Sequence, residues 1–290
     1  MELKEIRIKI QSVTNIWKLT SALETLSALK MKKSQKIALE SRPFAQKVGH
    51  LIRCLEPVLK DKVALRKRPL KNALAVVIAS DRGFCGSFNQ NILKFSTGQL
   101  KDLEKKSAVT VMPVGKKAVS FFKKKRVKFG RNMTGIGDYG TLEEIKPLSD
   151  FIIKEYIENR YQRVYLVWTD FKSTFVQKPR IMQLLPLEWD ELKEFAQESE
   201  CSASEEEMLI EPSAMMVVKE IIPQLVEYLI YQCVLESNAS EHSARMTAMR
   251  NASDNSHERV GELTLDYNKA RQEQITKEVC EISSAKEVLG

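Results

Sequence analysis

Glycine, proline, histidine and cysteine are all scarce in this chain. Its 290 residues include 11 glycines, nine prolines, three histidines and five cysteines. The cysteines are odd in number and form no CxxC pair, which argues against a disulfide framework or a zinc cluster and fits a reducing cytoplasm. So few histidines also argue against a histidine-rich metal site. We therefore expect a chain without a metal or any other cofactor.

Long apolar runs are missing as well. A membrane-spanning helix needs about 18 uninterrupted apolar residues, and the longest candidate, 215–234, is broken by Lys219, Glu220, Pro223 and Glu227. The N-terminal segment has no apolar run of signal-peptide length, and its acidic residues argue against a transit peptide. Any association with a membrane is therefore expected to be indirect.

The remaining composition is that of a folded, basic protein. Hydrophobic residues make up 43% and charged residues 29%, which excludes a wholly disordered chain. The net charge of +8 permits an acidic partner, whether nucleic acid, a membrane surface or another protein. Residues 1–68 carry 16 basic and six acidic side chains, whereas 188–207 carry nine acidic side chains and one lysine. Such segregation is a poor signature of general nucleic-acid binding and favours a protein partner.

The N-terminal segment has the periodicity of one long helix. Between Leu3 and about Lys60, two apolar stripes step by threes and fours, the spacing of helix faces. The first stripe is Ile6, Ile10, Val13, Trp17 and Thr20, and the second is Ile16, Leu19, Leu23 and Leu26. A helix that is apolar on two adjacent faces is usually enclosed by more than one partner. This helix would extend about 75 Å over about 50 residues.

The C-terminal segment repeats this spacing and would span about 110 Å as one helix over 215–289. Its periodic positions are Ile222, Leu225, Leu229, Cys233, Ser237, Ser240, Ala244, Thr247 and Asn251. Between Ala239 and Ser256 small residues replace Leu and Ile, so this part buries little apolar area. We interpret it as a slim rod that other subunits enclose, paired antiparallel with the N-terminal helix.

The middle of the chain alternates strands with helices. Buried strands are predicted at 73–80, 108–114 and 163–169, with helical segments between them and an irregular hairpin over 173–187 at the sheet edge. This alternation predicts an α/β domain with a mainly parallel sheet. The predicted domains are a discontinuous antiparallel coiled-coil shaft (1–68 and 208–290), an inserted α/β domain (69–187) and an acidic linker (188–207).

The motif SDRGFCGSFN follows the first strand at 80–89. Glycines between a strand and a helix can cradle phosphate through backbone N–H groups, but this spacing matches neither of the common nucleotide-binding patterns. A tight structural turn is the preferred interpretation. Its residues are Ser80, Asp81, Arg82, Gly83, Cys85 and Gly86. An enzyme that uses Asp81, Arg82 and Cys85 is the alternative, although no histidine is identifiable to pair with the thiol.

Two other features suggest chemistry at first sight. Residues 116–131 hold eight Lys or Arg and no acid, with Phe121, Phe122 and Phe129 expected to pack on the sheet while the cations stay solvated. A solvated face or an acidic protein partner is favoured there over nucleic acid. The Glu241-His242 pair lacks the second histidine of an HExxH zinc site. No nucleophile, base and orienting group come together, so we expect no active site.

Three segments resemble one family. ASEHSARMTAMRNASDN (239–255) and LDYNKARQEQITKEVCEI (265–282) resemble the C-terminal signature of the F-type ATP synthase gamma subunit. LKEIRIKIQSVTNIWKLTSALETLSALKMKKSQ (3–35) is similar to the first helix of that family, and SDRGFCGSFN to its motif after the first strand of the middle domain. The matches lie at both ends and in the middle of the chain, in the family's order.

The resemblance implies a rotor subunit without chemistry of its own. In that family the terminal helices enter a ring of three alpha and three beta subunits, and the α/β domain contacts the epsilon subunit and the membrane c-ring. Proton flow turns the c-ring, and the asymmetric shaft changes the nucleotide affinities of the beta sites in turn. These partners place the chain at the cytoplasmic face of a bacterial plasma membrane, peripherally bound and without nucleic acid.

The resemblance also assigns contact residues for the beta subunits. Arg271 and Gln272 match family positions that touch beta, Thr276, Glu278 and Glu281 continue that face, and Leu23 opposes it from the N-terminal helix. Lys30, Lys32 and Lys33 resemble a basic stretch that passes acidic loops of beta, with an ordinary solvated charge run as the alternative. The chain departs from the family pattern at Ile16, Trp17 and Leu19 and at its C-terminal tip. A static coiled-coil scaffold, or a diverged paralogue that no longer turns, is the second hypothesis.

Overall fold

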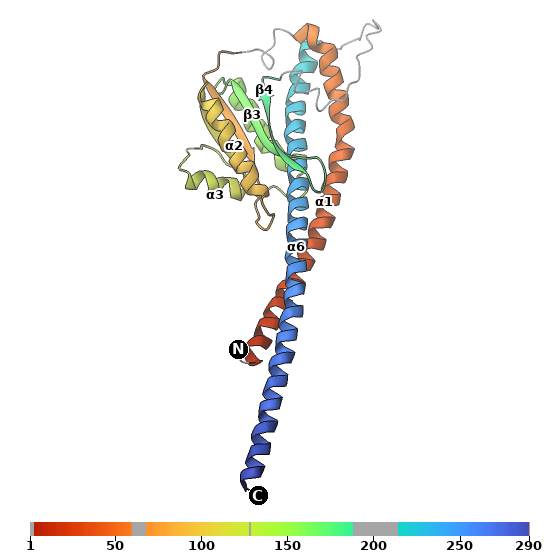
Figure 1. The fold of residues 1–290 in the computed structure, drawn as a ribbon. Coiled ribbons are helices and arrows are strands. Elements are labelled where there is room, and N and C mark those ends of the chain that lie inside the picture. The colour runs from red at the N-terminus through yellow and green to blue at the C-terminus, as the bar shows by residue number, and fades with distance from the viewer. Residues whose placement is uncertain (1–2, 60–67, 128, 188–213, 290) are drawn as a thin grey trace. The chain divides into compact units, whose positions relative to one another are not determined.

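A computed structural model describes residues 3–59, 68–127, 129–187 and 214–289 (Figure 1). Two long helices, α1 (Leu3–Leu59) and α6 (Ala214–Leu289), bracket a four-stranded sheet and its helices in chain order. The predicted fold class, long terminal helices around a mainly parallel α/β domain, is confirmed. The chain divides into two compact units. The helix pair consists of Met1–Ser27 with Arg245–Gly290, and the sheet unit consists of Ala28–Ala244.

The sheet has the strand order β2-β1-β3-β4. Its strands are β1 (Asn72–Ile78), β2 (Ala108–Val114), β3 (Arg163–Phe171) and β4 (Gln177–Leu185). β1 pairs in parallel with both β2 and β3, whereas β4 is an antiparallel edge strand. The hairpin predicted at the edge is present, but it is more regular than expected. β4 pairs with β3 along its length, with one register shift between Val164 and Tyr165.

Both faces of the sheet are covered, which explains why β1 is apolar at nearly every position. Leu74, Val76 and Ile78 point to one face, where α4 (Leu142–Ile157) and residues 222–234 of α6 pack on them. The intervening residues of β1 point to the other face, against α2 (Phe88–Glu104) and α3 (Lys116–Lys124). A strand buried on both sides needs no polar alternation.

Residues 222–235 of α6 are apolar because they form part of the core of the sheet unit. Leu229, Ile230, Cys233 and Val234 are almost fully buried there. Within the described ranges, no helix is both long and apolar enough to cross a membrane. The next turns of α6 carry small residues that approach β3, where Ser240 Oγ donates to the Thr169 carbonyl at 3.2 Å. The small residues at this level therefore have a cause within the chain.

The helix pair buries the first apolar stripe of α1. Ile6 and Thr20 are buried, as are Met249 and Leu263 of α6. The rings of Trp17 and His257 lie 4.7 Å apart between centroids, which sets the level at which the antiparallel helices meet. The buried positions of α6 in this pair continue as Met249, Ser253, Ser256, Val260, Leu263, Tyr267 and Ala270, all buried or half-buried. Asn251, predicted for the seam, is exposed. That prediction is wrong because the heptad phase shifts where α6 leaves the sheet unit.

The last part of α6 has no neighbour within the described chain. From Arg271 to Ser284 every side chain is exposed. The Trp17–His257 contact places Leu3, where α1 begins, level with about residue 271 of the antiparallel helix. Figure 1 shows α6 continuing past the N-terminal end of α1. These exposed turns follow directly from the unequal lengths of the two helices.

Candidate functional site

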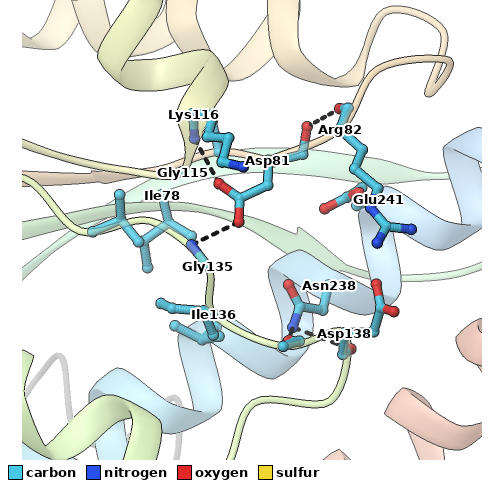
Figure 2. Close-up of a pocket in the computed structure, with 15 residues that line it drawn as sticks. Ile78, Asp81, Arg82, Gly115, Lys116, Gly135, Ile136, Asp138, Asn238 and Glu241 are labelled. Atoms are coloured by element: carbon cyan, nitrogen blue, oxygen red, sulfur yellow. Dashed lines mark hydrogen bonds between the residues drawn. The ribbon is translucent and has the colours of Figure 1, made fainter.

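The turn after β1 is organised by the carboxylate of Asp81 (Figure 2). One oxygen accepts a hydrogen bond from the Lys116 N–H at 2.7 Å, and the other accepts from the Gly135 N–H at 2.8 Å. Lys116 is the first residue of α3, and its N-cap residue, Gly115, has no side chain that could cap the helix. Asp81 therefore supplies from a distant turn the acceptor that an N-cap side chain normally provides.

The rest of the motif is held by Ser80 and Asn89. Asn89 Nδ2 donates to Ser80 Oγ at 2.7 Å, and Ser80 Oγ donates to the Arg82 carbonyl at 2.6 Å. Asn89 Nδ2 also lies 3.0 Å from Cys85 Sγ, and Cys85 is 2% exposed. A reactive thiol needs solvent access, so Cys85 is a packed structural residue. The interpretation as a tight turn agrees with these contacts, and the enzyme alternative finds no support in them.

A cavity of about 310 Å³ opens beside this turn, at the carboxyl ends of β1 and β2. Such an edge is the usual ligand site of an open α/β sheet. Here the lining includes three carboxylates (Asp81, Asp138 and Glu241) against Arg82 and Lys116. The N–H at the start of α3, which could bind a phosphate, already donates to Asp81. The described residues also contain no group of His, Cys, Asp or Glu that could hold a metal ion. The cavity therefore has neither a phosphate cradle nor a metal site.

Replacing Asp81 by Ala tests its structural role. The change leaves the Lys116 and Gly135 N–H groups without their acceptor, so we expect a loss of about 1–2 kcal/mol in the free energy of unfolding. Urea titration of the full chain measures this. Asp150→Ala on the exposed face of α4 is the matched control and should change stability by less than about 0.5 kcal/mol. Equal effects of the two changes would contradict the capping role.

A second group of polar contacts surrounds Asp138, in the loop before α4. Lys30 Nζ of α1 lies 2.5 Å from Asp138 Oδ2, and His242 Nε2 of α6 lies 3.5 Å from Oδ1. Burial alone would raise the pKa of Asp138, but the hydrogen bond from Lys30 and the charges of His242, Lys30 and Arg82 outweigh it and hold the pKa below its ordinary value. The stability that this carboxylate contributes is present above its unfolded-state pKa and is lost as pH falls through the lowered value.

The predicted lysine contacts lie in the sheet unit. Lys30 already has a partner in the chain, Asp138, and its side chain is 22% exposed. Lys32 is exposed, and the Lys33 ammonium lies 4.2 Å from the centre of the Tyr139 ring. Only Lys32 of these three is without a partner in the contacts described. The sequence pattern did not reveal the pairing, because Asp138 is more than 100 residues away from Lys30.

The predicted C-terminal contacts lie together on the exposed end of α6. Gln272 and Thr276 are joined by a Thr276 Oγ1–Gln272 O hydrogen bond of 2.9 Å, and Glu281 lies 3.8 Å from Lys277. The other two predicted contact residues on this helix, Arg271 and Glu278, are also exposed. Leu23 is half-buried and does not lie opposite them. It is level with about residue 251, about 30 Å along the axis from residue 271.

Sequence reasoning missed Asp138, Asn238 and His242 as structural partners. The signal available was the cluster Gly135-Ile136-Gly137-Asp138, which marks a tight connection between α3 and α4. The aromatic packing predicted for the basic segment is confirmed, because Phe122 is buried and Phe121 and Phe129 pack on the same core. Lys125 lies over the Phe121 ring at 4.8 Å, with its charge exposed.

Comparison with known proteins gives one consistent result. A sequence profile described as ATP synthase matches residues 2–289. The ATP synthase gamma chain of Pelotomaculum thermopropionicum is 37% identical over 287 residues, which are 97% of this chain and 96% of that relative. The gamma chain of Xanthomonas axonopodis pv. citri is 38% identical over 285 residues, 97% of each chain.

Solved structures agree. The central stalk and c-ring structure of Tetrahymena thermophila mitochondrial ATP synthase matches with a TM-score of 0.62 and 25% identity, over 81% of this chain and 99% of that one. A chain of Euglena gracilis mitochondrial ATP synthase in rotational state 3 matches with a TM-score of 0.64 over 99% of this chain and 94% of that one. At 18% identity, the second match supports the fold alone.

Long terminal helices that bracket an inserted sheet, taken with these matches, define a class of protein, the non-catalytic central-stalk component of an ATP synthase. Full-length similarity then fixes the family. The chain belongs to the ATP synthase gamma chain family. It is part of an ATP synthase complex, as a component of the central stalk, and is not itself an enzyme.

Proposed function

We propose that this chain is the rotating shaft of a proton-driven F-type ATP synthase, with the catalytic alpha and beta subunits around its helices. The observation that carries the proposal is the exposed second stripe of α1. Ile16, Leu19 and Leu26 remain 49%, 61% and 50% exposed although the first stripe is covered by α6. A contiguous apolar strip on a helix pair marks a protein interface.

The proposed contacts with beta subunits follow from the family resemblance. Arg271, Gln272, Thr276, Glu278 and Glu281 are accessible on the unpaired end of α6, which supports their assignment as contact residues. Leu23, Lys32 and Lys33 are proposed contacts from α1, and Lys30 contributes through its pair with Asp138. The domain arrangement that goes with this proposal is the one predicted from the sequence: a shaft of 1–68 and 208–290, an α/β domain of 69–187 and a linker of 188–207.

We place the α/β domain toward the epsilon subunit and the c-ring. The related structures contain a central stalk, a c-ring and, in Euglena gracilis, F1. The two gamma chains that are 37% and 38% identical to this chain come from bacteria, which supports a peripheral position at the cytoplasmic face of the plasma membrane. In this arrangement the chain does no chemistry. An asymmetric shaft stabilises different conformations of the surrounding subunits as it turns, and this couples rotation to nucleotide affinity.

Reconstitution tests the proposal directly. The full chain is assembled with the alpha and beta subunits of the same ATP synthase, and ATP hydrolysis is measured beside an assembly that lacks the chain. A rotor predicts faster hydrolysis in the complete assembly, and co-purification of all three subunits. A static scaffold predicts co-purification without stimulation. Hydrolysis no faster than without the chain would therefore reject the rotor.

Charge reversal at Arg271 tests the residue assignment. In the complete membrane complex, Arg271→Glu should lower ATP synthesis by about fivefold, because a cation at an interface is replaced by a charge of the opposite sign. Lys269→Glu is the matched control, since its side chain is also exposed and lies about 160° around the helix from Arg271. Unchanged synthesis with Arg271→Glu would remove that residue from the contact set while leaving the rotor proposal intact.

A further inference from the structure

Asp138 lies at a junction of three elements of the sheet unit. It belongs to the loop 135–140, the last part of the connection from α3 to α4. From α1, Lys30 Nζ reaches Asp138 Oδ2 at 2.5 Å, and Ser34 Oγ donates to the Asp138 carbonyl at 3.3 Å. The neighbouring Lys33 ammonium lies over the ring of Tyr139. Three side chains on two successive turns of α1 therefore contact two adjacent residues of one loop.

The same loop is bound from α6. Asn238 Nδ2 donates to the carbonyls of Gly137 and Asp138, both at 3.2 Å, and Figure 2 shows the two residues facing each other. His242, one turn further, is 2% exposed, and its Nε2 is 3.5 Å from Asp138 Oδ1. The two carboxylate oxygens of Asp138 thus face different helices, Oδ2 toward α1 and Oδ1 toward α6.

The loop itself is fixed to the α/β domain at two points and is closed by one internal hydrogen bond. The Gly135 N–H donates to Asp81 at 2.8 Å, and the Gly137 N–H donates to Glu144 Oε2 at 3.1 Å. Glu144 is part of the capping box that begins α4, together with Thr141. The Gly140 N–H closes the loop on the Gly137 carbonyl at 3.0 Å. Because the loop is held in this way, it resists displacement of a helix that is bound to it.

The two helices are attached to the α/β domain by different kinds of contact. α6 is held by a large apolar core that includes Leu225, Leu229 and Val234. The α1 segment beside the loop buries one large apolar side chain, Met31, and otherwise small ones such as Ser34 and Ala38, which interlock little. Apolar contacts are non-directional, whereas hydrogen bonds and ion pairs depend on angle and distance. The polar contacts at Asp138 are therefore the ones that fix the rotational and axial position of α1.

We infer that Asp138 is a positioning residue for rotary coupling: it locks α1 to the α/β domain and to α6, so that torque applied to the domain turns both helices together. The inference rests on the proposed rotor function. Without these contacts, α1 shifts relative to α6 when torque acts on the domain, and the rotation of the domain is only partly transmitted to α1. A slip of this kind lowers the work obtained per ATP while leaving hydrolysis itself intact.

The test uses the complete membrane complex in vesicles, with ATP-driven proton pumping and ATP hydrolysis measured on the same sample. Lys30→Ala and Asp138→Ala should each lower the pumping-to-hydrolysis ratio by about two- to fivefold, the range expected for a partly exposed ion pair. The double variant should be no worse than the worse single variant, because both changes remove one interaction. Lys30→Arg should restore most of the ratio, which a loss of folding would not allow.

Lys36→Ala is the matched control: Lys36 lies about 1.7 turns beyond Lys30 on α1, and among the described contacts it has an exposed pair with Glu40 at 3.7 Å. Its ratio should equal that of the unmodified complex. If the unmodified complex pumps protons and Lys30→Ala pumps equally well per ATP, the lock is overturned and the rotor proposal stands. If the unmodified complex hydrolyses ATP without pumping, both fail. Lys30→Ala lies on a helix surface and favours helix, so it keeps the test valid even if Asp138→Ala reduces assembly.

Discussion

Replacing Gly115 by Ala is expected to leave little folded chain. Gly115 has φ +93°, and a Cβ built on it would lie 2.0 Å from the Ala79 carbonyl oxygen. That oxygen belongs to the backbone at the end of β1. The N–H of the same residue, Ala79, donates to the Val114 carbonyl at 2.9 Å and so joins the end of β1 to β2. Neither strand can move without breaking the sheet. We expect a loss of at least about 4 kcal/mol, a large part of the stability of an ordinary domain.

The measurement is the yield of soluble full chain together with its midpoint of thermal unfolding. Gly98→Ala in α2 is the control, because a Cβ there meets nothing within 4 Å and the backbone is already helical. It should stabilise the chain by about 0.5–1 kcal/mol. A soluble Gly115→Ala chain with an unchanged midpoint would show that the strand ends are more adaptable than this close approach implies.

The elements of the fold were predictable because their patterns are local. The run at 73–79 has no polar residue before Ser80, and its short length and β-branched residues favour a strand covered on both faces. The terminal helices were predictable because residues such as Ile6 and Trp17 repeat at helical spacing without an interrupting glycine. In each case the information lies within a few turns of chain.

The contacts of the site were not predictable, because they join segments far apart in the sequence. Lys30 looks like one member of a basic run, and nothing near it reveals that Asp138 neutralises it. Asp81 looks like part of a possible phosphate-binding turn, and its role as the acceptor at the start of α3 depends on how the strands are ordered. The shift in seam phase at Met249 has the same origin. It falls where α6 passes from the sheet unit to the helix pair.

The same dependence on neighbours gives one helix two kinds of leucine. Leu229 is 0% exposed in the core of the sheet unit, whereas Leu265 on the outer part of α6 is 72% exposed. Leu229 belongs to the apolar repeat of the helix, whereas Leu265 falls between the seam positions Leu263 and Tyr267. If α6 is at once a core helix and an interface helix, truncating these two leucines should affect different properties of the protein.

Leu229→Ala should therefore lower the free energy of unfolding by about 2–5 kcal/mol, since it leaves a cavity among Leu225, Ile230 and Cys233. Leu265→Ala should change it by less than about 0.5 kcal/mol, because no cavity forms at an exposed site. Urea unfolding of the full chain measures both values. Assembly with the alpha and beta subunits should show the opposite order for the chains that remain folded, with Leu265→Ala weakening it through the lost apolar contact. Equal destabilisation by the two changes would mean that Leu265 is buried in the free chain. The outer part of α6 would then not be a partner interface.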